Sequence, residues 1–301
     1  MNRLKPLQNI SRKIDHWIEE PIDPRPIAWF RAWFGFLCLV NLALLWPDMN
    51  MWLANDGVLP PPVHATMISG KSFTIYSLTG YSALAIPLIK TCGLIGGLSL
   101  LIGIRPKIGA FLSWLAISSF SWRNMNILHS GDALLRVGCF FLMFADSSAA
   151  FAVSSVFRKT ATHHARLVAA WPQRIMQLQL CAAYFVTGVW KSIGRPWQDG
   201  TAVGTVLQLG EFQRFPIPDF LMTPTMSQVM TYHTLILELG FPFLVWIPQL
   251  RIPVLILGLS LHIGLEWTLN VQMFQWTITA FYLLFLTPAA STLTSPAKVL
   301  K

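Results

Sequence analysis

Residues 177–200, QLQLCAAYFVTGVWKSIGRPWQDG, join an apolar run of helical length to one lysine, Lys191, close to the end of that run. The run then breaks at Gly194 and Pro196. An ammonium group inside a membrane costs about 2.5–3.5 kcal/mol even on a lenient insertion scale. A lysine near a helix end can escape this cost by reaching the headgroups, or can lose its proton and act as a base or nucleophile. Position alone favours snorkelling or ion pairing, and the residues around Lys191 shift the balance toward chemistry.

The composition indicates that most of the chain lies in lipid. Of its 301 residues, 54% are hydrophobic and 12% are charged, whereas a soluble domain has about 25% charged residues. The net charge of +9 does not indicate nucleic acid, because the basic residues stand in short loops where they set membrane topology. The 4 cysteines lie in apolar runs without a CxxC pair, so we expect packing residues and no metal site.

Eight apolar runs are long enough to cross roughly 30 Å of hydrocarbon, counting one short run. The sequence therefore predicts an all-α, polytopic integral membrane helical bundle of about eight transmembrane helices. An interfacial helix is expected at Pro6–Glu20, within a basic cytoplasmic segment 1–26 that precedes a membrane domain 27–290 and a tail 291–301. The last two runs are so close that residues 266–272 form a tight turn or the runs are partly re-entrant. The runs are Ile27–Trp46, Ser82–Ile104, Ile108–Trp122, Asp132–Val153, Gln173–Ile193, Gln228–Ile247, Ile252–Trp267 and Val271–Leu286.

The loop charges predict the orientation. With the N-terminus inside, thirteen Lys and Arg residues lie in cytoplasmic segments and four lie in outer loops. Positive charge stays on the cytoplasmic side, so we expect a multi-pass protein of the plasma (inner) membrane with both termini in the cytoplasm. The Lys191 end of its span then faces outward.

A second indication of function comes from the charged and imidazole side chains that lie in or at the predicted spans. Asp132 precedes Arg136 by four residues, the favoured order for a helical ion pair, which we expect to be structural. On sign alone, Glu238 and Glu266 are the counter-ions expected for Arg31 and Lys90. His262 and Glu266 lie one helical turn apart, but a third metal ligand is not evident. Together these groups predict a polar cavity, which is either an active site or a transport path. They are Arg31, Lys90, Asp132, Arg136, Asp146, Lys191, Glu238, His262 and Glu266.

Four blocks resemble one known family. Residues 184–191, with Tyr-Phe-x-x-Gly-x-x-Lys followed by Trp-x-x-Gly at 197–200, are similar to the most diagnostic block of the HTTM (horizontally transferred transmembrane) proteins. These are bacterial relatives of the membrane domain of vitamin K-dependent gamma-glutamyl carboxylase. Trp29–Val40, Asn124–Leu135 and His262–Leu286 resemble three further blocks, and the resemblance covers residues 25–290.

The resemblance implies a chemistry. In the carboxylase, the matching lysine is the base that deprotonates vitamin K hydroquinone, and oxygen then makes the strong base that removes a proton from a peptide glutamate. By residue match, Lys191, His129 and His262 are the candidate catalytic residues. A reduced quinone of the menaquinone or vitamin K hydroquinone type is the expected cofactor, in a quinol- or lipid-using enzyme with carboxylase, lyase or epoxidase-like activity. The candidate substrate-binding residues are Asn124, Asn126, Arg31, Trp197, Asp199, Glu238 and Glu266.

Two other functions stay open. The chain can be a non-enzymatic membrane subunit that helps to mature, export or neutralise a secreted peptide, or a small transporter. The expected partners are the lipid bilayer and either a secreted peptide or a membrane partner subunit, without nucleic acid. A transporter more often shows matching halves with broken helices, and no such symmetry is visible in the sequence.

Overall fold

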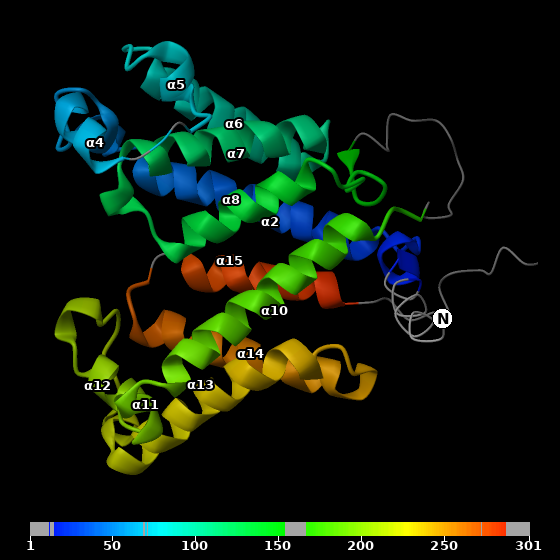
Figure 1. Cartoon of the computed structure of the whole chain (residues 1–301), viewed down its shortest axis with the longest axis vertical. Coiled ribbons are helices and arrows are strands. Elements are labelled where there is room, and N and C mark those ends of the chain that lie inside the picture. Colours follow the sequence, from blue (N-terminus) through cyan, green and yellow to red (C-terminus); the bar gives the residue numbers. More distant parts are fainter. Residues whose placement is uncertain are drawn as a thin grey trace, which may run out of the picture. The chain divides into compact units, whose positions relative to one another are not determined.

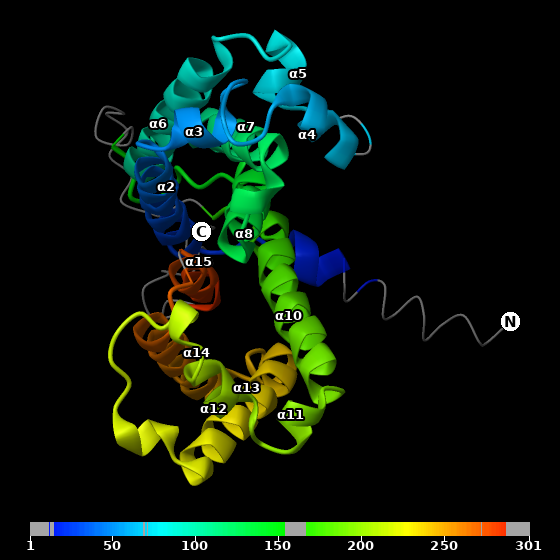
Figure 2. The same cartoon turned by 90° about the vertical axis from the view of Figure 1, so that its left-hand side faces the viewer.

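The computed structural model describes residues 12, 15–68, 70, 72–153, 167–271 and 273–286, and every named element within them is a helix (Figures 1 and 2). Among the described residues, the β pairing consists of two isolated antiparallel bridges. The prediction of an all-α fold is therefore confirmed. The chain divides into two compact units, one formed by Met1–Leu128, Leu135–Ile175 and Leu286–Lys301, the other by His129–Leu134 and Met176–Phe285.

Three long helices form the centre of the first unit. Helix α6 (Ala85–Ile102) packs against both α2 (Arg25–Leu45) and α7 (Pro106–Arg123), and α6 and α7 lie side by side in both views (Figures 1 and 2). The crossing of α2 and α6 depends on glycine, because a Cβ at Gly35 would stand 2.8 Å from the carbonyl oxygen of Gly97. Small residues let membrane helices approach closely, so that dispersion between the backbones holds them together.

Short elements complete the first unit. Helix α5 (Ile75–Thr79) begins with a reciprocal capping box. In it, the Ser77 N–H donates to the Thr74 hydroxyl at 3.1 Å and the Thr74 N–H donates to Ser77 Oγ at 2.9 Å. This arrangement satisfies two backbone donors that have no partner inside the helix. The short elements are α3 (Met49–Leu53), α4 (Pro61–Met67), α5 (Ile75–Thr79), η1 (Met125–Ile127) and the greater part of α8 (Ser130–Leu142).

The second unit is built around an aromatic core. Tyr184 of α10 (Trp171–Ser192) lies with its ring 4.5 Å from that of Phe241, in α13 (Pro224–Leu244), and the Phe241 ring lies 5.5 Å from that of Tyr282. Helix α13 packs against α14 (Pro248–Thr268), as the views also show (Figures 1 and 2). The other elements are α11 (Arg195–Gln198), α12 (Ala202–Leu207), η2 (Gly210–Phe212), η3 (Asp219–Met222), α14 (Pro248–Thr268), α15 (Phe274–Ala280) and η4 (Phe281–Phe285).

In the part of the chain that the structure describes, three helices are long and apolar enough to cross a membrane: α2, α6 and α14. The predicted count of eight spans is therefore not confirmed. The last predicted run forms α15 and η4, which together extend for about 20 Å at 1.5–2.0 Å per residue, less than the roughly 30 Å of hydrocarbon. This length is compatible with the re-entrant alternative for that run. The predicted tail 291–301 and most of the predicted interfacial helix at Pro6–Glu20 lie outside the described residues.

Candidate functional site

Lys191 forms an ion pair with Glu238 in the second unit. Its ammonium group, in the last turn of α10, lies 2.5 and 2.6 Å from the two carboxylate oxygens of Glu238 on α13. Gly188 makes room for this approach, because a Cβ there would stand 3.2 Å from the Cβ of Glu238. The pair is largely shielded, with side chains 27% and 10% exposed. Glu238 is thus the counter-ion of Lys191, which agrees with the ion-pairing alternative for this lysine.

The two predicted counter-ion assignments are corrected. Glu266 pairs with Arg214, which lies between η2 and η3, and the Lys90 ammonium lies 4.5 Å from the centre of the Trp46 ring. Arg31 belongs to the first unit, where its guanidinium donates to the carbonyl oxygen of Phe151 at 2.7 Å. Sign alone misassigned these pairs because it carries no information about which helices are neighbours.

A chain of buried hydrogen bonds lies next to this pair in the same unit. The Tyr184 hydroxyl bonds to His262 Nε2 at 2.6 Å and to the Tyr282 hydroxyl, while His262 Nδ1 bonds to Gln275 Oε1. A carbonyl oxygen only accepts, so Nδ1 of His262 carries the hydrogen and Nε2 accepts from Tyr184. Tyr184 in turn accepts from Tyr282. Both ring nitrogens of His262 are therefore engaged, which favours a positioning role over direct proton transfer to a ligand.

Gly258 makes room for this chain of hydrogen bonds. A Cβ at Gly258 of α14 would overlap the Tyr282 hydroxyl, so only glycine lets that hydroxyl reach Tyr184. Burial of polar groups is tolerated when each has a partner, and a fully satisfied network fixes the rotamers of its members. The site is thus rigid at the point where α10, α14 and η4 meet.

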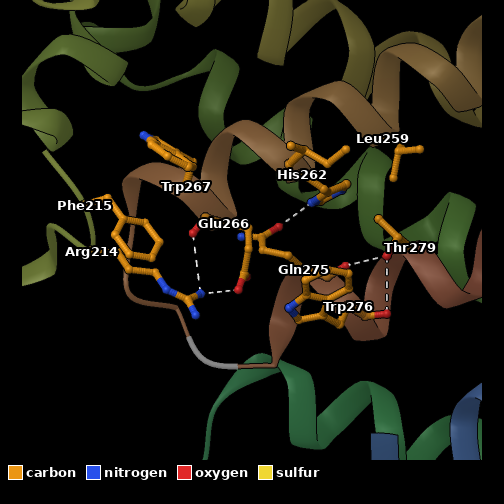
Figure 3. A pocket seen from close by; sticks show the side chains of 10 residues that line it. Arg214, Phe215, Leu259, His262, Glu266, Trp267, Gln275, Trp276 and Thr279 are labelled. Atoms are coloured by element: carbon orange, nitrogen blue, oxygen red, sulfur yellow. Dashed lines mark hydrogen bonds and ion pairs between the residues drawn. The ribbon is translucent and has the colours of Figure 1, made fainter. Parts of the chain in front are cut away.

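A pocket of about 260 Å³ opens on α14 and α15 (Figure 3). In its wall, His262 and Gln275 point toward one another and are hydrogen-bonded, and Arg214 reaches toward Glu266 (Figure 3). Most of the remaining wall is apolar or aromatic. The lining residues are Arg214, Phe215, Leu259, His262, Ile263, Glu266, Trp267, Gln275, Trp276 and Thr279.

The loop segment between η2 and η3 is attached to the end of α14. The Arg214 guanidinium pairs with the Glu266 carboxylate, and the Arg214 N–H donates to the Thr268 carbonyl oxygen at 3.2 Å. The ring of Phe215 lies 5.1 Å from that of Trp267. These contacts hold the segment against one side of the pocket, so the pocket is built from three separate parts of the chain.

Asn124 and Asn126 lie in the first unit. The Asn124 side chain is buried, donates to the Trp52 carbonyl oxygen at 3.1 Å and accepts from the Asn126 N–H at 3.0 Å. Beside it, the guanidinium of the buried Arg123 donates to the Ala54 carbonyl oxygen at 2.8 Å. These bonds anchor the C-terminal end of α3 to the end of α7. The substrate-binding role of Asn124 and Asn126 stays a prediction.

His129 stands just before α8 and interacts locally. Its Nδ1 accepts from the Gly131 N–H at 3.1 Å, and its Nε2 lies 3.5 Å from a carboxylate oxygen of Asp132. Among the described residues its hydrogen bonds and ion pairs go to these neighbours and not to Lys191 or His262. The catalytic role of His129 and the structural pairing of Asp132 with Arg136 stay predictions.

The aromatic and polar residues that follow Lys191 differ in their placement. The Lys191 ammonium lies 5.4 Å from the centre of the Trp197 ring, whereas Asp199 is exposed and its Oδ2 lies 3.5 Å from Nε of Arg195.

Sequence reasoning missed four polar members of the site. Gln275 stands in an apolar run, where a polar side chain is costly, and this signal could have revealed it. The missed residues are Tyr184, Arg214, Gln275 and Tyr282.

An all-helical chain with helices apolar enough for a bilayer, and with ion pairs enclosed by its helices, has the features of an integral membrane protein. The family model described as HTTM domain matches residues 19–289, most of the chain. The chain therefore belongs to the HTTM domain family and is a membrane protein related to the vitamin K-dependent carboxylase. No curated protein and no solved structure matches it.

Proposed function

We propose that this protein is a membrane enzyme acting on a reduced quinone, of the menaquinone or vitamin K hydroquinone type, or on a similar lipid-phase substrate, with Lys191 as its base. The observation that carries the proposal is the shielded pair of Lys191 with Glu238, whose two oxygens lie 2.5 and 2.6 Å from the ammonium nitrogen. A base needs a neutral amine, and a neighbouring group that accepts its proton can supply one.

Glu238 is suited to accept that proton. Its two carboxylate oxygens lie 2.5 and 2.6 Å from the Lys191 ammonium nitrogen, so a proton can pass directly from Lys191 to Glu238. The free amine of Lys191 then takes a proton from a hydroxyl held beside it. The resulting ammonium stabilises the negative oxygen, while Glu238 releases its proton to water.

The surroundings of Lys191 fit a flat apolar substrate that arrives from lipid. Trp190 and Ile236, on the helices that carry the pair, are 69% and 70% exposed, and apolar side chains exposed in a membrane protein face lipid. The half-buried Trp197 ring lies beside the ammonium. A reduced quinone supplies acidic hydroxyls on an apolar ring, and these residues would hold that ring and move its proton.

The test replaces Lys191 by arginine, which keeps the positive charge and can pair with Glu238 but does not lose its proton at working pH. Purified full-length protein in nanodiscs is supplied with reduced menaquinone and dissolved oxygen as the oxidant, and loss of the quinol beyond that in empty nanodiscs is followed by absorbance and chromatography. We expect Lys191→Arg to lower turnover by about 10²–10⁴-fold, the usual contribution of a positioned base.

Lys90→Arg is the matched control, because Lys90 is a helix lysine of the first unit that packs over Trp46. We expect that variant to keep its turnover. Near-normal turnover in Lys191→Arg would show that Lys191 supplies only charge, and the enzyme proposal would fail.

A second candidate is a membrane subunit that binds a secreted peptide. It is favoured by the loop segment around η2 and η3, where Phe212 and Phe220 are exposed. Exposed aromatic residues are common at protein interfaces. Co-purification of a peptide that is lost in Phe220→Ser, together with full quinol stability in the wild type, would favour this function.

A further inference from the structure

The pocket on α14 and α15 runs along a helix that is long and apolar enough to cross a membrane. Its lining residues on α14 begin at Leu259 and end at Trp267, a distance of about 12 Å at 1.5 Å per residue. A volume of about 260 Å³ drawn out over this length makes a narrow groove. This shape fits a hydrocarbon chain better than a molecule with several fused rings.

The groove opens on the exposed side of these helices. Three of its apolar lining side chains, Ile263, Trp267 and Trp276, are exposed. Exposed apolar side chains on a membrane-spanning helix lie against lipid tails, because the hydrocarbon core of a bilayer holds no water. Lipid tails are therefore the molecules that surround the open side of the groove.

Polar side chains in the wall are bonded to other parts of the protein (Figure 3). His262 Nδ1 donates to Gln275 Oε1, and the Thr279 hydroxyl donates to the Gln275 carbonyl oxygen at 2.7 Å. Most of the wall that faces the groove is thus apolar. Left unfilled, this wall would lose the van der Waals contacts that close packing provides, and a lipid tail in the groove supplies them.

Arg214 gives one end of the groove a group that can hold a phosphate. Its backbone is bonded to Thr268, the last residue of α14, and its side chain is partly exposed. A guanidinium has five N–H donors, so the pair with Glu266 leaves donors for a second acceptor. Phosphate suits a guanidinium well. The exposed Trp267 at the same end is typical of the level where headgroups meet hydrocarbon.

We propose that this groove binds one tail of a membrane phospholipid, whose phosphate accepts hydrogen bonds from the Arg214 guanidinium. The tail extends from Trp267 toward Leu259, between α14 and α15. The lipid is a bound component of the protein and is not its substrate. This inference goes beyond the proposed function, because the residues of the groove do not include the Lys191 pair and the ligand is not a quinol.

Photo-cross-linking tests the groove. Full-length protein is placed in nanodiscs that contain phosphatidylglycerol with a diazirine in one acyl chain, and labelled peptides are identified by mass spectrometry after irradiation. The reference is the surface of α13 around Ile236, which is exposed but does not line the groove. We expect labelling of residues 259–267 and 274–279 to exceed the reference by about tenfold or more, which corresponds to about 1.4 kcal/mol. Equal labelling of the two surfaces would overturn the proposal.

A larger side chain at the open edge tests where the tail lies. Ile263→Trp fills the groove, so we expect its labelling to fall to the level of the reference surface. Ile236→Trp is the matched control, because it makes the same change at an exposed isoleucine outside the groove. That variant should keep the labelling of the groove. Full labelling of the groove in Ile263→Trp would contradict the proposal.

The identity of the lipid is tested in the wild-type protein, which keeps the test valid if Ile263→Trp does not fold. Diacylglycerol with the same diazirine chain has no phosphate, and we expect it to label the groove about tenfold less than phosphatidylglycerol. Equal labelling by the two lipids would remove the role of Arg214 and overturn the phospholipid assignment.

Unlabelled menaquinone in excess separates this groove from the proposed enzyme site. We expect it to leave the labelling unchanged, and displacement of the phospholipid would assign the groove to the quinol and overturn the proposal. Lys191→Gln should keep the labelling of the groove even if it is inactive. A failed enzyme proposal and a failed groove proposal therefore give different results.

Discussion

At the scale of single residues, the partner of Lys191 changes what that lysine does for the fold. A lysine without a partner could be replaced at little structural cost, but Lys191 holds the carboxylate of Glu238 in a site that is mostly shielded from solvent. Loss of one partner leaves the other charge poorly solvated. Stability and chemistry are therefore coupled at this pair, and activity tests need variants that preserve the charge.

The pair can be tested by a double-mutant cycle. We expect Glu238→Gln to lower the free energy of unfolding by about 1–3 kcal/mol, between the values for exposed and fully buried ion pairs, because Lys191 is partly exposed. Adding Lys191→Gln should recover at least about 1 kcal/mol of that loss. Thermal unfolding in detergent gives the measurement, and strictly additive losses in the double variant would contradict the pairing.

At the scale of elements, the helices approach through small residues. Gly35 of α2 faces the backbone of α6 so closely that a methyl group would collide with it. In lipid there is no hydrophobic drive between helices, so van der Waals contact at such crossings supplies much of the association. The sequence predicted the apolar length of α2 correctly. It did not show which face of α2 contacts α6, because that contact depends on the packing of the two helices.

We expect Gly35→Ala to destabilise the protein by about 1–3 kcal/mol, as overpacking of a tight contact does. Gly264 is the matched control, because it lies in α14 and a Cβ there would meet nothing within 4 Å. Gly264→Ala should be neutral or stabilising by up to about 1 kcal/mol, since alanine restricts the unfolded chain and favours helix. Equal melting temperatures for Gly35→Ala and wild type would argue against the close crossing.

At the scale of the whole molecule, the open question is how the helices traverse the bilayer. Only α2, α6 and α14 meet the length and hydropathy of a span among the described residues, yet α10 carries the half-buried Lys191 and the buried Tyr184. Helices that are polar on one face can still cross a membrane if that face is enclosed by other helices. Burial of Lys191 and Glu238 against one another is of this kind.

Reporter fusions test the predicted orientation. The bias of Lys and Arg toward one set of loops predicts that both termini lie in the cytoplasm. A fusion after Lys301 should therefore give a cytoplasmic signal, and an insertion within Phe212–Phe220 should give an extracytoplasmic one. The same signal from both positions would reverse the assignment of the Lys191 end to the outer side.

The sequence by itself determined the class of the protein, because low charge and long apolar runs leave few alternatives to a helical membrane protein. It also singled out Lys191, Glu238, His262 and Glu266, since ionisable or imidazole groups in apolar runs are costly and must have a purpose. Their partners were decided only by the tertiary structure. Lys191 meets Glu238 from 47 residues away, and Glu266 meets Arg214 from 52 residues away. Charge sign and hydropathy are properties of single residues and segments, whereas pairing depends on which helices pack together and on the small residues that let them approach.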